Sequence, residues 1–182
     1  YGQDAYKIGI LLSLYTGIRI GELCALKWEN IDLNTGAIMI NATLQRIQDF
    51  KGISGNKTKI VITEPKTPSA RRTIPIPDFI VKRLKAVNPK NKSAFLLSGT
   101  ENFTEPRALT YLFKKCLEES SVPNINFHAL RHTFTTRCIE AEFEPKALSE
   151  ILGHSSVNTT LGIYTHPSLE FKRENINRLT PF

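Results

Sequence analysis

The chain has 182 residues, of which 41% are hydrophobic and 23% charged, and its 24 lysines and arginines exceed its 17 acidic residues, giving +7. This composition is typical of one globular domain that buries its own core. No stretch approaches the roughly 20 apolar residues that cross a bilayer, and the apolar segment Ile8–Tyr15 does not lead into a signal-peptide cleavage site. We therefore expect a cytoplasmic protein with no membrane partner.

Helical periodicity dominates the chain. Asp4 can cap a first helix that ends at Gly17, and a short second helix is expected near Gly21. From Pro77 onward the apolar spacing and the prolines at 106 and 145 predict a series of helices. Their expected ranges are 79–87, 106–116, 128–141, 145–152, 157–165 and 169–179.

Three strands are expected between the second and third helices. They cover Ala37–Leu44, Lys59–Thr63 and Arg72–Ile76. The first two are separated by a Gly-, Lys- and Ser-rich stretch over 45–58, which we expect to be a mobile hairpin loop, and the last two by a tight connection over 64–69. The predicted fold class is mainly α with a small antiparallel three-stranded β-sheet.

Basic residues are concentrated in one part of the chain. Residues 46–92 hold 12 basic and 3 acidic side chains, a balance that attracts polyanions such as DNA. The expected DNA contacts are Lys57, Lys59, Arg71 and Arg72. The charge alone is also compatible with a solvated, solubilising surface.

The three cysteines form no C-x-x-C pair. Cys24, Cys116 and Cys138 are therefore expected to be reduced, largely buried thiols, as in a cytosolic protein.

Four short segments carry side chains suited to chemistry at a phosphate. They contain Arg19, Lys66, the pair His128 and Arg131, and the pair His154 and Tyr164. Two arginines can each direct two N–H groups at phosphate oxygens, and a tyrosine can act as nucleophile once a base or nearby cations activate it. A phosphodiester is therefore a fitting substrate for this set.

Each residue also has an ordinary structural explanation when it is taken alone. Arg19 can form a surface salt bridge, a lysine in a turn is usually exposed, and a helical tyrosine usually packs. His128 and His132, one helical turn apart, could bind a metal, but no glutamate lies between them as in H-E-x-x-H. We expect no metal.

Taken together, these segments resemble the tyrosine recombinase family, in particular the integrases of phages and conjugative elements. The family pattern has a T-G-x-R-x-x-E-L segment, a β-turn lysine, an H-x-x-R box, an L-G-H box and a terminal tyrosine. The matching segments here are Thr16–Leu23, Lys66–Pro75, His128–Phe134, Leu152–Val157 and Thr159–His166. The resemblance implies the tyrosine recombinase catalytic-domain fold over residues 1–182, without the core-binding and arm-binding domains that usually precede it.

The resemblance also implies a division of labour. Tyr164 would attack the scissile phosphate and form a 3′-phosphotyrosine, His128 would help to take its proton, and Lys66 would protonate the departing 5′ oxygen. We expect the Tyr164 hydroxyl to lie away from the arginines when DNA is absent, because a Ser/Asn/Thr-rich stretch precedes it and Gly162 lies beside it.

Arg19 and Arg131 would hold the phosphate, and His154 would donate a hydrogen bond to it. The family needs neither metal nor ATP, so no cofactor is expected. The expected partners are double-stranded attachment-site DNA, further copies in a homotetramer on DNA (a monomer as the isolated domain) and possibly a directionality factor. The segment Leu169–Leu179 is a candidate for docking on a neighbouring subunit.

Three alternatives stay open at this point. A type IB topoisomerase-like relaxing enzyme would share the same chemistry. A DNA-binding regulator would keep the basic surface without the chemistry, and a zinc enzyme would be built on His128 and His132.

Overall fold

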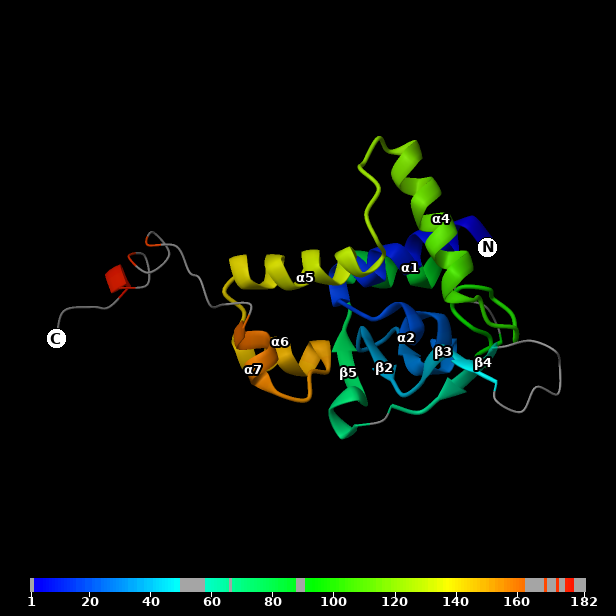
Figure 1. The fold of residues 1–182 in the computed structure, drawn as a ribbon, viewed down its shortest axis with the longest axis horizontal. Helices are drawn as coiled ribbons and strands as arrows, with labels where there is room; N and C mark the ends of the chain where they lie inside the picture. Colours follow the sequence, from blue (N-terminus) through cyan, green and yellow to red (C-terminus); the bar gives the residue numbers. More distant parts are fainter. Residues whose placement is uncertain are drawn as a thin grey trace.

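The computed structural model describes residues 2–49, 58–65, 67–87 and 91–162, together with residues 169, 173 and 176–178 (Figure 1). Its helices confirm most of the predicted ones. They are α1 (Gly2–Thr16), α2 (Ile20–Ala25), α3 (Asp78–Val87), α4 (Pro106–Glu119), α5 (His128–Glu140), α6 (Pro145–Leu152) and α7 (Val157–Leu161). Of the predicted helix over 169–179 the structure describes only residues 169, 173 and 176–178, and the end of the one over 157–165 lies outside the described residues.

The ends of these helices follow from local sequence. α4 and α6 each have a proline in the first turn, and the Glu144 side chain accepts bonds from two backbone N–H groups at the start of α6. α6 ends at Gly153, whose φ of 63° is left-handed, and α1 ends before Gly17, whose φ is 64°. Glycine adopts this conformation at little cost, so both stops were readable from the sequence.

The β structure differs from the prediction. The three-stranded antiparallel sheet has the order β1 (Ile31–Asp32), β2 (Ala37–Ile40), β5 (Arg72–Pro75). A separate antiparallel hairpin pairs β3 (Thr43–Gln48) with β4 (Thr58–Thr63). The expected loop over 45–58 is therefore strand at both ends, and residues 50–57 lie outside the described residues.

The predicted strand Ala37–Leu44 is wrong as one strand, because the chain leaves the first sheet at Asn41. Beside this point the side-chain Nδ2 of Asn41 donates to the side-chain Oδ1 of Asn30 at 2.8 Å. β3 then runs against α2, so closely that a Cβ on Gly21 would lie 2.6 Å from the Leu44 carbonyl oxygen. Packing against α2, which no strand pattern encodes, separates the two strands.

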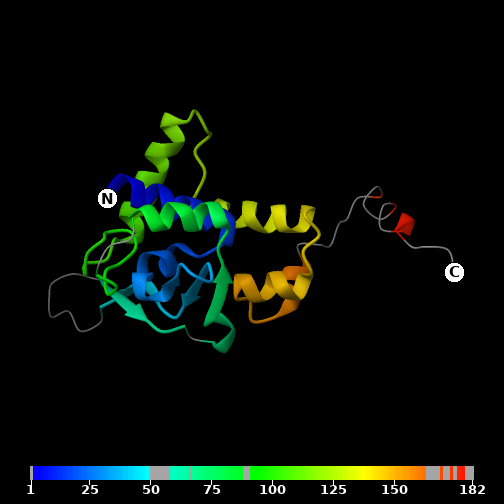
Figure 2. The same ribbon diagram turned by 180° about the vertical axis from the view of Figure 1, so that it is seen from behind.

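Most of the core lies between the three-stranded sheet and the helices α1 to α4, around the fully buried Trp28. A smaller cluster joins α5 to α6 through Phe134, Cys138, Leu148 and Leu152. Figures 1 and 2 show α5 extending beyond the main body, with α6 and α7 beside it. None of the described helices is long and apolar enough to span a membrane.

Candidate active site

Three predicted site residues from distant parts of the chain lie together. Arg19 immediately precedes the first turn of α2, Arg131 lies in the first turns of α5, and His154 follows the end of α6. The Arg131 Nη2 atom lies 3.0 Å from the His154 Nε2 atom. The structure thus brings these residues into one site at the end of α6.

Two glycines allow the segments to meet. A Cβ on Gly17 would lie 2.6 Å from Cδ1 of Phe134, and a Cβ on Gly153 would lie 2.9 Å from Nη1 of Arg72. Both glycines are also in the left-handed conformation that other residues rarely adopt. The glycines of the T-G and L-G-H segments are therefore required by backbone geometry and by close packing.

The end of α6 is capped by three arginines. Its last backbone carbonyls have no partner within the helix, and they carry the negative end of the helix dipole. Three successive carbonyls accept from three different arginines. The bonds run from Arg72 Nε to Ile151 O at 2.6 Å, from Arg131 Nη2 to Leu152 O at 2.7 Å, and from Arg19 Nη2 to Gly153 O at 3.3 Å.

Glu22 balances part of this positive charge. Its buried carboxylate accepts from the Arg19 backbone N–H at 3.0 Å and from Arg19 Nη1 at 2.9 Å. It also accepts from Arg72 Nη1 at 3.0 Å and from Arg72 Nη2 at 2.8 Å. Burial raises the pKa of Glu22, but the bonds and charges of Arg72 and then Arg19 outweigh it and lower the pKa overall. The carboxylate is therefore ionised at neutral pH.

Arg131 is buried, with only 6% of its surface exposed. Its Nη1 donates to the Gly17 carbonyl at 2.7 Å, which ties α5 to the turn before α2. Burial, and then the like charge of Arg19, lower the pKa of Arg131 to about 9, although Glu22 acts to raise it. Arg131 is still a cation at neutral pH, in a place where a bound anion would be stabilised.

The His154 ring is held on both sides. Its Nε2 faces Arg131, and its Nδ1 lies 2.9 Å from the hydroxyl oxygen of Thr160. An arginine can only donate, so Nε2 accepts and the ring proton is assigned to Nδ1. Burial and the charges of Arg131, Arg19 and Arg72 lower the pKa of His154 to about 4. The ring is therefore neutral at pH 7.

His128 stands at the exposed first turn of α5, three residues before Arg131. Its ring packs edge to face on His132, with 4.7 Å between the ring centroids. Burial, followed by the charges of His132, Arg131 and Arg19, lowers the pKa of His128. A neutral imidazole can take a proton, which is the role predicted for this residue.

The predicted DNA contacts separate into different classes. Arg71 is exposed, and the Lys59 ammonium lies 3.6 Å from the Asp49 carboxylate, with half of the lysine side chain exposed. The predicted DNA contact of Arg72 is not supported by its place in the fold, because β5 turns this side chain inward to Glu22 and leaves 6% of it exposed. Lys57, Lys66 and Tyr164 lie outside the described residues.

Sequence reasoning missed two parts of this site. Arg72 belongs to the network around Glu22, and Thr160 positions the His154 ring. The alternating burial of β5, with Arg72 and Ile74 inside, was available as a signal for the first. The described residues contain no group of three or more histidine, cysteine or acidic side chains arranged to hold a metal.

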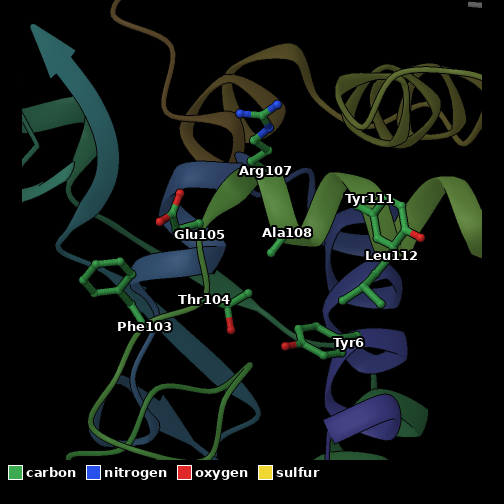
Figure 3. A pocket seen from close by; sticks show the side chains of 8 residues that line it. All are labelled: Tyr6, Phe103, Thr104, Glu105, Arg107, Ala108, Tyr111 and Leu112. Carbon is green, nitrogen blue, oxygen red and sulfur yellow. The ribbon is translucent and has the colours of Figure 1, made fainter. Parts of the chain in front are cut away.

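A separate hollow of about 740 Å³ lies between α1 and the start of α4 (Figure 3). Its lining includes Tyr6, Phe103 and Tyr111, and none of the predicted catalytic residues that the structure describes. It therefore takes no part in the site at the end of α6.

Comparison with known sequences tests the family resemblance. The profile of the phage integrase family matches residues 4–170, which is nearly the whole chain. The chain belongs to the phage integrase family. The match extends over every segment that was predicted to carry a site residue.

Individual members of the phage integrase family show the same relationship. The chain is 33% identical over 176 residues to a tyrosine recombinase XerC-like protein of Caldanaerobacter subterraneus subsp. tengcongensis, covering 88% of this chain and 45% of that one. It is 29% identical to the transposase from transposon Tn916 of Enterococcus faecalis, covering 93% and 44%. The chain thus spans less than half the length of these curated relatives.

Solved structures of integrases confirm the predicted fold. The Tn1549 transposon integrase in complex with transposon right end DNA superposes with a TM-score of 0.72 at 27% identity, covering 96% of this chain and 58% of that one. The XerA recombinase, at 23% identity and a TM-score of 0.61, shares the fold.

Proposed function

We propose that this protein is the catalytic part of a site-specific DNA recombinase that integrates or excises a mobile element through a 3′-phosphotyrosine. The proposal is carried by one observation, the convergence of Arg19 and Arg131 on successive carbonyls at the end of α6. Family membership and the DNA complexes of the Tn1549 integrase support it.

The two arginines keep donors for a phosphate. Of the five N–H groups on each guanidinium, Arg19 uses two and Arg131 three in contacts among the described residues. The others can point at non-bridging phosphate oxygens, where charge grows in the transition state. Neutral His154 would add a hydrogen bond from its ring once the phosphate takes the place of one of its present partners.

The covalent step transfers the phosphoryl group from DNA to the enzyme. The Tyr164 oxygen attacks phosphorus and the bond from phosphorus to the 5′ oxygen breaks. His128 helps to accept the tyrosine proton, and Lys66 gives a proton to the leaving oxygen. The 5′-hydroxyl of a partner strand then attacks the phosphotyrosine and releases Tyr164, so no ATP is consumed. The arginines supply the positive charge that a metal would otherwise supply.

DNA is held by the basic surface in this proposal. Arg71, Lys59 and Lys57 contact the phosphate backbone, and the full-length protein acts as a homotetramer on attachment-site DNA in the cytoplasm, on the nucleoid. Core-binding and arm-binding domains would precede this chain, and a directionality factor would bias excision against integration.

The test uses the full-length protein and a nicked suicide DNA carrying the element's attachment site, in EDTA and without ATP. Covalent adducts are expected on denaturing gels and should be absent in Tyr164→Phe. Arg19→Ala and Arg131→Ala should slow adduct formation by about 10²–10³-fold, as for other donors to developing charge. Arg137→Ala, an exposed arginine on the same helix as Arg131, is the matched control.

Adducts that persist in Tyr164→Phe would overturn the assignment of the nucleophile. Efficient relaxation of supercoiled plasmid without strand exchange would instead favour the topoisomerase-like alternative.

A further inference from the structure

Arg72 is the third arginine at the end of α6, and the proposed reaction gives it no role. Its guanidinium forms four hydrogen bonds among the described residues. These are the two to Glu22, the one to Ile151 O, and one from Nη1 to Ala70 O at 3.1 Å. These bonds use four of the five N–H groups of the guanidinium, so we assign Arg72 to the protein network and not to a phosphate.

These bonds connect three segments that carry predicted catalytic residues. Ala70 and Arg72 follow Lys66 in the sequence, Glu22 accepts from Arg19, and Ile151 precedes the L-G-H segment of His154. The aliphatic part of Arg72 also lies under Gly153, where a Cβ would be 3.0 Å from its Cδ. Arg72 therefore contacts the supports of Arg19 and His154 at the same time.

The charge of Arg72 affects how the Glu22 carboxylate interacts with Arg19. With Arg72 in place, each Glu22 oxygen is shared between Arg72 and Arg19. If Arg72 were absent, the buried Glu22 carboxylate would keep its bonds to Arg19 and lose those to Arg72. Glu22 would then compete with the phosphate for the Arg19 donors, and Ile151 O would lose its partner.

We propose that Arg72 is a positioning residue, which fixes the Glu22 carboxylate and the last turn of α6 so that Arg19 and Arg131 face the same phosphate. The inference rests on the proposed function for its consequence in catalysis. Its geometric part concerns this chain alone, and can be tested without the reaction.

The first test is structural. Crystal structures of the DNA-free full-length protein and of Arg72→Met would show whether the guanidinium groups move. We expect the Arg19 bond to Gly153 O to be lost and the end of α6 to shift. Unchanged positions of Arg19 and Arg131 in the variant would overturn the proposal, whether or not the protein proves to be a recombinase.

The second test is kinetic and uses the suicide DNA substrate. Arg72→Met should form adducts about 10–100-fold more slowly, the scale expected for a small misplacement of catalytic groups. DNA affinity and its dependence on salt should be unchanged, because Arg72 is buried. Arg137→Met, at an exposed arginine, should cleave at the wild-type rate. A wild-type rate in Arg72→Met, or a weaker salt dependence, would contradict the proposal.

The pH profile separates positioning from a purely structural role. The charged groups facing Glu22 are Arg19 from the turn before α2, Arg72 from β5 and Arg131 from α5. Without Arg72 the pKa of Glu22 should rise. Burial raises this pKa, and the hydrogen bonds and charge of the Arg72 guanidinium, which lower it, would be absent. The acid limb of the cleavage rate should then move to higher pH.

His154 must be separated from this effect, because Arg72 also lowers its pKa. In the double variant Arg72→Met/Glu22→Gln the new limb should disappear and part of the rate should return. A limb that persists there belongs to His154 and contradicts the proposal.

If Arg72→Met does not fold, Arg72→Lys takes its place. Lysine keeps the positive charge but cannot form the paired bonds of the guanidinium to Glu22. The acid limb of the cleavage rate should then stay near its wild-type pH while the rate itself falls. A wild-type rate in Arg72→Lys would overturn the proposal.

Discussion

Arg131 and His154 are joined nitrogen to nitrogen, with 3.0 Å between Nη2 and Nε2. The contact exists only while the imidazole is neutral, because a protonated ring would present an N–H to a cation. Thr160 completes the arrangement by facing Nδ1. The folded protein therefore selects both the charge and the tautomer of this ring.

Stability should fall as the pH falls through the range set by this ring. The pKa of His154 is lowered from 6.5 to about 4, so between these values the unfolded chain binds more protons than the folded one. The contribution of the ring is complete above about pH 6.5 and is lost as the pH approaches 4. Thermal unfolding at a series of pH values should show a melting temperature that decreases over this window.

The slope should be shallower in His154→Gln, which has no proton to bind there. His128, whose pKa is also lowered, accounts for part of the slope that is left. A profile as steep in His154→Gln as in the wild type would show that the ring does not carry the effect.

Glu22→Ala should be strongly destabilising. It leaves the Arg72 guanidinium buried without its anion, and breaking a buried ion pair in this way typically costs about 3–5 kcal/mol. Glu140→Ala is the matched control, because it breaks the exposed pair with Arg137 and should cost at most about 1 kcal/mol. Urea denaturation measures both free energies of unfolding, and equal losses would contradict the buried network.

Gly17→Ala should destabilise the fold by about 1–3 kcal/mol. The new Cβ would meet Phe134 and Leu152 at under 3 Å, in a backbone conformation that alanine rarely adopts. Gly162→Ala is the control, since nothing lies within 4 Å of a Cβ there and its φ of −55° suits alanine. Denaturant midpoints for the two variants should differ clearly, and a similar shift in both would refute the packing argument.

Arg71→Ala should weaken DNA binding without changing stability. An exposed arginine that neutralises one phosphate should lower the slope of log affinity against log salt concentration by about one unit. Fluorescence anisotropy at several salt concentrations measures this slope, and thermal melting checks the fold. An unchanged slope would remove Arg71 from the DNA-contacting surface.

Cys116 should be the thiol that reacts first in the native protein. Burial raises the pKa of Cys24 to about 12 and that of Cys138 to about 11, and both side chains are buried, whereas Cys116 is half-buried. Titration with a maleimide at pH 8 should label Cys116 in the native state and the other two thiols only in urea. Native labelling that survives Cys116→Ser would contradict this order.

Much of the fold was predictable because local signals agreed with it. The proline starts of α4 and α6 and the glycine stops after α1 and α6 are set by backbone conformation alone. The break between β2 and β3 was not predictable, because Ala37–Leu44 reads as one strand. Contact with α2 bends the chain there, and that contact depends on residues far apart in the sequence.

The same division applies to the site. The chemical groups of the site could be predicted without the fold, since the motifs around Arg19, Arg131 and His154 are contiguous stretches with fixed spacing. The different surroundings of Arg71 and Arg72 depend on the tertiary structure. Arg72 alternates with Ile74 in β5, which places it on the buried face, but the alternation does not supply the partner that a buried arginine needs. Glu22, 50 residues away, makes burial of Arg72 favourable by supplying the matching charge, and Arg71 is left at the surface.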